Sequence, residues 1–198
     1  MAPRADKGRI AIGFRVKSGW ATAVLVGGSM ESPQVLDRRA IDLCDLALAE
    51  SRQPYHAAMG KLETDEAKVN RRRKVVSEAA NRSITDLMKD YHNAGHRAGA
   101  AALVVGSDID PARISNPHIR AHALEGRLFR TVLEDALRSV GLSCSVIVER
   151  KVYSQAAKIL KRREEDLKRS LAQLGRQVGG PWRADEKTAC LAAWLALA

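Results

Sequence analysis

The chain has 198 residues, a formal net charge of +10 and a hydrophobic content of 45%. This length and composition allow a packed core, and they exclude a disordered chain. The excess of positive charge favours an anionic partner, most simply nucleic acid or a nucleotide. We therefore expect a single domain over residues 1–198.

The three cysteines, Cys44, Cys144 and Cys190, are widely spaced and form no CxxC motif. Their odd number argues against a disulfide framework or a zinc ribbon, and their apolar neighbours predict buried free thiols. No apolar run reaches membrane-spanning length, and residues 1–8 lack the apolar stretch of a signal peptide. We expect a cytoplasmic protein without membrane contact.

The first half of the chain predicts strands followed by a long helical segment. Residues 10–14, 19–26 and 34–43 read as three strands with short connections, which together form an antiparallel meander. Helical structure is expected over 62–94, with Thr64 as a candidate cap and Asn81 leaving a division into two helices open.

The second half alternates strands with helices. The unbroken apolar segments 100–106 and 143–148 predict two buried strands, separated by a helix over 118–140. A charged helix over 153–175 and a final apolar helix after residues 179–181 complete the chain. This order predicts an α/β fold, in which a three-strand antiparallel meander plus two further strands form a mixed sheet flanked by helices.

Three short segments carry a family resemblance. They are residues 10–13 (IAIG) with 18–21 (SGWA), residues 103–108 (LVVGSD), and residues 184–189 (ADEKTA) before the apolar tail. With this order of elements, the chain resembles the ribonuclease H-like superfamily, and within it the Holliday junction resolvase branch. The resemblance covers most of the chain, and it implies that the first strand and the last helix meet at a metal site.

The resemblance also implies a Mg²⁺-dependent phosphodiester hydrolase, an endonuclease that holds divalent cations between carboxylates. Asp185 and Glu186 stand where the family places its last-helix acid, and Asp108 or Asp110 stands near its central acid. We therefore expect these four residues to be catalytic, with Asp108 and Asp185 as the metal ligands. Each also has a simpler interpretation as a turn or helix cap.

The chain departs from the family pattern in its first strand. Between residues 10 and 16 it offers Gly13, Phe14 and Arg15 but no carboxylate, and a cation there would repel a metal. Either the metal site has been rebuilt with other acids, or catalysis has been lost. The candidates for a rebuilt site are Glu63, Asp65 and Glu125.

Clusters of basic residues predict a phosphate-binding face, and one tryptophan between a proline and an arginine is the best candidate for stacking on a base. The expected nucleic-acid-binding residues are Arg15, Lys17, Arg38, Arg39, Arg71, Arg72, Arg73, Trp182, Arg183 and Lys187.

His118, His122 and Glu125 share one helical face at i, i+4 and i+7. This spacing is compatible with zinc or another transition metal, although a polar helix face is the commoner explanation. His92 and His96 have the same i, i+4 spacing near a helix end, where we expect charge or capping roles.

Two functional hypotheses follow. The first is a nucleic-acid-binding ribonuclease H-like protein that acts as a divergent, metal-dependent resolvase-like nuclease. The alternative is a catalytically inactive adaptor or scaffold on the same fold, with a second copy or another protein as a further partner left open. An actin-like nucleotide-binding relative ranks last, because the chain is too short for two lobes.

Overall fold

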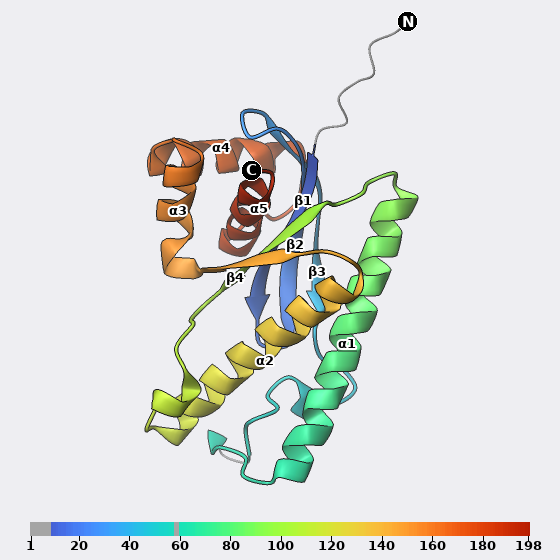
Figure 1. Cartoon of the computed structure of the whole chain (residues 1–198), viewed down its shortest axis with the longest axis vertical. Helices are drawn as coiled ribbons and strands as arrows, with labels where there is room; N and C mark the ends of the chain where they lie inside the picture. Colours follow the sequence, from blue (N-terminus) through green and yellow to red (C-terminus); the bar gives the residue numbers. More distant parts are fainter. Residues whose placement is uncertain (1–8, 58–59) are drawn as a thin grey trace, which may run out of the picture.

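A computed structural model describes residues 9–57 and 60–198 of the chain (Figure 1). None of the helices in these described residues combines the length and the hydropathy needed to cross a membrane. The strands are β1 (Arg9–Lys17), β2 (Trp20–Gly28), β3 (Pro33–Asp42), β4 (Ala100–Val105) and β5 (Cys144–Val148), and the α-helices are α1 (Glu66–Asn93), α2 (Pro117–Ser139), α3 (Val152–Ile159), α4 (Glu164–Gln177) and α5 (Ala184–Ala196).

The five strands form one mixed sheet in the order β3-β2-β1-β4-β5. Strands β1, β2 and β3 pair antiparallel, whereas β4 pairs parallel to β1 and β5 pairs parallel to β4. A two-residue turn joins β1 to β2, and Gly19 adopts a φ of 85° there, which suits glycine. The predicted α/β fold, a meander plus two further strands flanked by helices, is therefore confirmed.

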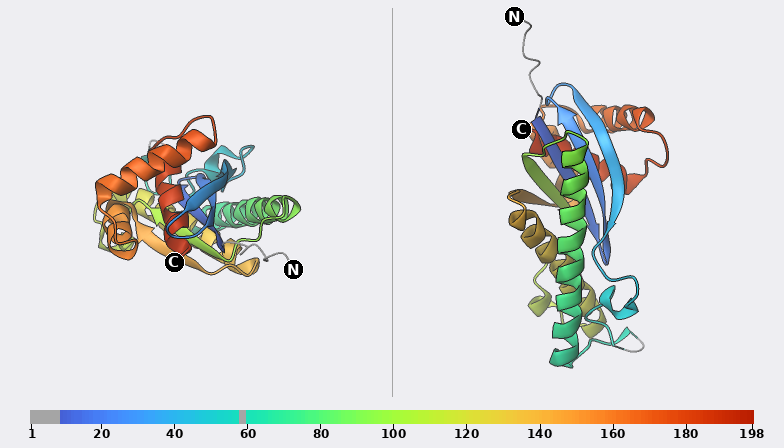
Figure 2. Two further views of the ribbon diagram at one scale, coloured as in Figure 1. Left: turned by 90° about the horizontal axis from the view of Figure 1, so that it is seen from above. Right: turned by 90° about the vertical axis from the view of Figure 1, so that its right-hand side faces the viewer.

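Successive side chains of each strand point to opposite faces of the sheet, so the core is divided into two clusters, one on each face. Ile12 and Phe14 of β1 pack in the cluster under α1 and α2, whereas Ala11 packs in the cluster under α5. The views in Figures 1 and 2 show α1 and α2 on one side of the sheet and α3, α4 and α5 on the other. The first strand is thus buried on both faces, as its continuous apolar sequence requires.

The structure settles one open alternative for the predicted helices and corrects two details. Helix α1 runs without a break through Asn81, and its N-cap is Asp65, not Thr64, because the Asp65 carboxylate accepts the Lys68 N–H at 3.1 Å. The charged segment 153–175 is two helices, α3 and α4. The chain turns between them at Lys161, whose φ of 51° ends the helical path.

The cysteines are free, and Cys44 and Cys190 are buried while Cys144 is half-buried. Burial raises the pKa of the Cys190 thiol to about 12, because the thiolate would lie among apolar side chains.

We expect Cys190 to resist alkylation by iodoacetamide in the folded protein at about pH 8 and to react once urea unfolds the chain. The unfolded thiol ionises near pH 8.5, so stability should fall as the pH rises above that value toward 12. Peptide mass spectrometry checks the labelling, and native-state labelling of Cys190 at the unfolded rate would contradict this assignment.

Candidate functional site

The carboxyl ends of the parallel strands β1, β4 and β5 meet at one edge of the sheet, which is where ligands bind in open α/β sheets. A cleft of about 270 Å³ opens there, between the ends of β1 and β4 and helix α2. Its walls include Arg15 and Lys17 from β1, Ser107 after β4, and His122 from α2. This edge is the location at which the sequence predicts a metal site.

Arg15 occupies this edge as a buried cation. It lies on the face of β1 that α5 covers, and its side chain is 5% exposed. Its guanidinium donates two hydrogen bonds to Glu149, from Nε at 3.1 Å and from Nη2 at 2.5 Å, and a third to the Val16 carbonyl at 2.7 Å. An arginine that donates two hydrogen bonds to one carboxylate forms a stronger and more specific ion pair than one joined by a single hydrogen bond.

Asp185 completes the charged cluster from the first turn of α5. Its Oδ1 lies 3.3 Å from Lys17 Nζ and 3.8 Å from Arg15 Nε. Two cations from β1 therefore face two carboxylates, one after β5 and one on α5. We call these four residues, Arg15, Lys17, Glu149 and Asp185, the edge cluster.

Glu149 is the member of the edge cluster that the sequence analysis missed. It directly follows the apolar strand β5, at the same edge of the sheet as the acids that come a few residues after β4. A carboxylate immediately after a predicted buried strand was therefore an available signal.

Asp108 and Asp110 lie after β4 and are paired with helix α2. Asp108 accepts a hydrogen bond from Arg130 at 2.6 Å, and Asp110 accepts one from Arg127 at 3.2 Å. Asp110 also caps a short 3₁₀ turn by accepting the Ala112 N–H. Helix α2 covers the face of the sheet opposite to α5, so these two acids are engaged on a different side from Asp185 (Figure 1).

The remaining acids with predicted roles also have structural partners. Glu186 accepts the Arg183 backbone N–H at 2.9 Å and so caps the start of α5. Glu63 pairs with Arg72 at 3.3 Å, and Glu125 Oε1 accepts a hydrogen bond from His56 Nδ1 at 2.7 Å.

The edge cluster does not fit Mg²⁺ as arranged. Mg²⁺ requires oxygen ligands in near-octahedral geometry and would sit between the carboxylates. That position is taken by the guanidinium of Arg15, which already binds Glu149 and adjoins Asp185. A cation of the protein itself neutralises the carboxylates at this edge.

Several of the predicted phosphate-binding residues line a second groove, of about 290 Å³, beside the start of α5. Arg38 and Arg39 of β3 lie on one wall and Arg183 on the other. Arg39 is partly held by Asp37 at 2.7 Å, and this hydrogen bond raises the pKa of its guanidinium further. Arg38 donates to the Gly179 carbonyl at 2.9 Å. We call this hollow the arginine groove.

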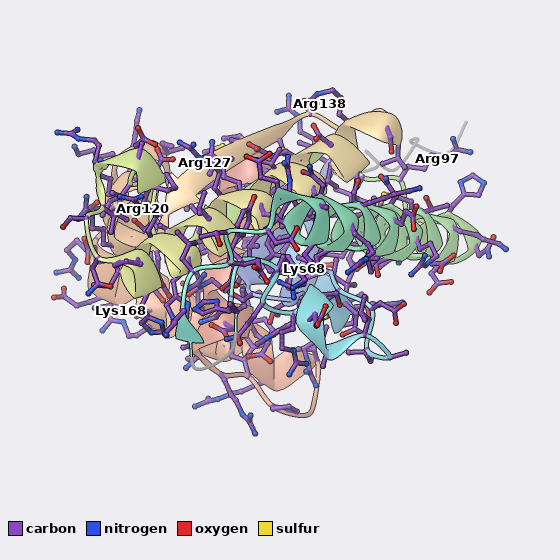
Figure 3. All side chains as sticks on the ribbon, turned by 90° about the horizontal axis from the view of Figure 1, so that it is seen from below. Lys68, Arg97, Arg120, Arg127, Arg138 and Lys168 are labelled. Carbon is purple, nitrogen blue, oxygen red and sulfur yellow. The ribbon has the colours of Figure 1, made fainter. Side chains whose placement is uncertain are left out.

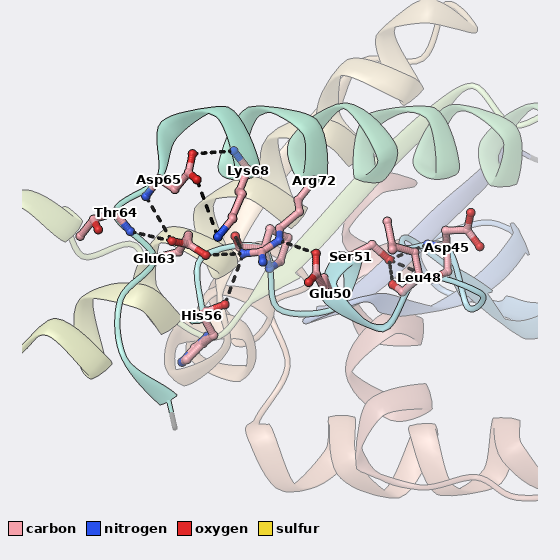
Figure 4. Close-up of polar contacts among 11 residues, drawn as sticks. Asp45, Leu48, Glu50, Ser51, His56, Glu63, Thr64, Asp65, Lys68 and Arg72 are labelled. Carbon is pink, nitrogen blue, oxygen red and sulfur yellow. Dashed lines mark hydrogen bonds and ion pairs between the residues drawn. The ribbon is translucent and has the colours of Figure 1, made fainter. Parts of the chain in front are cut away.

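Other predicted phosphate-binding residues are arranged differently. Arg71 and Arg73 are exposed on α1, and Lys187 is half-buried on α5. Arg72 is buried, with its side chain 6% exposed, and holds a loop through Glu50 and Glu63 (Figure 4). Figure 3 shows further basic side chains spread over the lower side of the molecule, labelled on α1, α2, α4 and the connection between α1 and β4.

Trp182 is half-buried rather than displayed for stacking. Its indole N–H donates to the Leu171 carbonyl at 2.7 Å, and its ring packs where a Cβ on Gly175 would collide with it. These contacts attach the segment before α5 to helix α4.

Comparison with solved structures shows the fold. Thermus thermophilus RuvC aligns over 94% of this chain and 92% of its own, with 10% identity and a TM-score of 0.54. The same protein in complex with a Holliday junction substrate gives 9% identity and the same TM-score over 94% and 91%. The yeast mitochondrial resolvase Ydc2 aligns over 99% and 79% with 9% identity and a TM-score of 0.47.

No protein-family model and no curated protein sequence matches the chain. The chain has a ribonuclease H-like fold that resembles the Holliday junction resolvases, as the sequence predicts.

Proposed function

We propose that this protein binds nucleic acid through a ribonuclease H-like fold and does not hydrolyse it with metal ions at the sheet edge. The observation that carries this proposal is the position of Arg15, buried between Glu149 and Asp185 at the carboxyl end of β1. Metal-dependent phosphodiester cleavage needs carboxylates that are free to bind cations. Here Arg15 neutralises both carboxylates, so we infer that this edge of the sheet supports nucleic-acid binding without metal-dependent cleavage.

The arginine groove supports the choice of nucleic acid as the ligand. Arg38 and Arg183 line the groove with planar guanidinium groups, which recognise phosphate oxygens in pairs, and the acids Asp185 and Glu186 line it as well. The guanidinium of Arg39 is held on the α1 side of the sheet by Asp37 and Asp90. The net charge of +10 adds a long-range attraction for polyanions. A protein of the same fold, Thermus thermophilus RuvC, was solved with a Holliday junction substrate, so branched DNA is the first ligand to test.

The proposal predicts binding that depends on salt and not on divalent cations. Fluorescence anisotropy with a labelled four-way junction, duplex and single strand should show binding in EDTA that weakens as salt is added. Replacing Arg38 and Arg183 by glutamine should weaken binding and lower the magnitude of the salt slope by about 2, one for each lost phosphate contact. Arg138→Gln is the matched control, because Arg138 is an exposed arginine on α2, outside the groove.

The nuclease hypothesis makes the opposite prediction. It requires cleavage of the junction with Mg²⁺ or Mn²⁺, through Asp108 and Asp185 with Asp110 and Glu186, and loss of cleavage in Asp185→Asn. That pair of results would overturn the proposed absence of metal-dependent catalysis. No binding of any of the three nucleic acids in low salt would reject the nucleic-acid proposal itself.

A further inference from the structure

Three histidines from two distant parts of the chain converge beside the N-terminal end of α2. His56 comes from the loop before α1, and His118 and His122 lie one turn apart at the start of α2. One nitrogen from each of the three rings lies within 4.8 Å of the corresponding nitrogens of the other two. In residues 9–57 and 60–198, no other three histidine, cysteine or acidic side chains come together in this way. We call these residues the histidine cluster.

The outer partners of two rings fix which nitrogen faces the cluster. His118 Nδ1 lies 2.8 Å from the Gly60 carbonyl oxygen, and His56 Nδ1 lies 2.7 Å from Glu125 Oε1. Both partners are acceptors, so in the neutral rings Nδ1 carries the proton and Nε2 carries a free lone pair. Metal-binding histidines have this arrangement, in which an outer carboxylate or carbonyl orients the ring.

The spacing of the inner nitrogens suits a tetrahedral metal. His118 Nε2 and His122 Nε2 are 3.3 Å apart. Two ligands at zinc–nitrogen distances of about 2.1 Å in tetrahedral geometry are separated by about 3.4 Å. The separation of these two nitrogens is therefore close to that of two ligands of one ion.

Three buried side-chain atoms have no hydrogen-bond partner in the described part of the chain, and two of the three, His56 Nε2 and Glu125 Oε2, lie at the histidine cluster. Glu125 is completely buried. An ion held by the cluster would bind His56 Nε2 directly. His122 Nδ1 lies 3.6 Å from Glu125 Oε2. If His122 binds the ion through Nε2, its Nδ1 carries the ring proton, which would then point toward Glu125 Oε2.

The loop that carries His56 is held in place by Arg72 from α1 (Figure 4). Arg72 donates to the carbonyls of Pro54 and His56, each at 3.3 Å, and its charge is balanced by Glu50 and Glu63. Because these contacts fix the backbone of His56, the third ring is positioned before any ligand arrives.

We propose that His56, His118 and His122 bind one zinc ion through their Nε2 atoms, with Glu125 and the Gly60 carbonyl as the outer partners. Three protein ligands leave a fourth position for water or another oxygen ligand. His122 also lines the cleft beside Arg15 and Lys17, so the ion would lie at the wall of that cleft. The inference is independent of the proposed function, because no member of the edge cluster is a ligand.

The test uses the full chain, freed of metal with a chelator and titrated with zinc chloride at about pH 7.5. Calorimetry should give one zinc ion per chain, and the midpoint of thermal unfolding should rise with zinc concentration. Cobalt chloride should give the intense visible absorption of tetrahedral Co²⁺.

Single substitutions of exposed ligands make the test specific. His118→Ala and His122→Ala should each weaken zinc binding by more than about 100-fold, beyond the 10–100-fold that outer partners contribute. His92→Ala, in the last turn of α1, and His96→Ala, just after that helix, are matched controls with the same sequence spacing, and they should leave affinity unchanged. Absence of zinc binding in the wild type, or undiminished binding in His118→Ala and His122→Ala, would overturn the proposal.

Discussion

Replacing Gly13 by alanine is expected to destabilise the protein by about 3 kcal/mol or more, a large part of the stability of an ordinary domain. Gly13 lies in the middle of β1, where helix α5 crosses the strand so closely that backbone meets backbone. A Cβ at this position would lie 2.5 Å from the Ala193 nitrogen and would overlap the Ala189 carbonyl oxygen. Because these are main-chain atoms of a buried helix, no side chain can rotate to make room.

Urea denaturation followed by circular dichroism measures this effect, with a lower midpoint at an unchanged slope as the expected result. Gly126→Ala is the matched control, since Gly126 lies within α2 with open space around the added Cβ. Alanine should stabilise that helix by up to about 1 kcal/mol. An unchanged midpoint for Gly13→Ala would mean that α5 does not pack on β1 as described.

The fold was largely predictable because its signals are local. Continuous apolar strands, short turns and an alternation of strands with helices gave the sheet and its flanking helices. The division of segment 153–175 was not predictable in the same way. Its turn falls at Lys161, in a run without glycine or proline, and the left-handed backbone of a lysine leaves no compositional trace.

The candidate sites were less predictable because they depend on contacts between distant residues. Arg15 stood out as a departure in the first strand, but its partner Glu149 is 134 positions away. The pair at His118 and His122 was visible as a helical spacing. Its third member, His56, comes from a loop whose position depends on Arg72, a residue that the sequence assigned to phosphate binding.

The family resemblance and the structure agree on where Asp185 lies, and the structure adds which charges surround it. Asp185 lies at the edge that the resemblance implies, yet it faces Lys17 and Arg15. A family pattern transfers the position of a residue through the fold, whereas the charge of its neighbours depends on the individual sequence.

Removing both carboxylates of the edge cluster tests whether they balance the charge of Arg15 or serve as metal ligands. In the double variant Glu149→Gln with Asp185→Asn, the buried guanidinium of Arg15 keeps its hydrogen bond to the Val16 carbonyl but loses both counter-charges. Breaking a buried ion pair typically costs 3–5 kcal/mol, and we expect about 2–3 kcal/mol here. The expected cost is lower than for a fully buried pair because the Glu149 side chain is 46% exposed, so water already screens its charge.

A triple variant separates this explanation from a metal-ligand role. Adding Arg15→Met to the double variant removes the unpaired charge, so part of the lost stability should return, in the manner of buried ion pairs replaced by apolar side chains. Asp135→Asn is the control, since Asp135 pairs with Arg138 on the exposed surface and should change stability by less than about 0.5 kcal/mol.

If Glu149 and Asp185 were instead metal ligands, millimolar Mg²⁺ would raise the unfolding midpoint of the wild type, and the double variant would lose that response. We expect no Mg²⁺ response in the wild type, because the cation site between these carboxylates is filled by Arg15. If the triple variant is no more stable than the double variant, the Glu149 and Asp185 carboxylates are not needed to balance the charge of Arg15. The two results together decide whether the edge cluster is an internal salt bridge or a latent metal site.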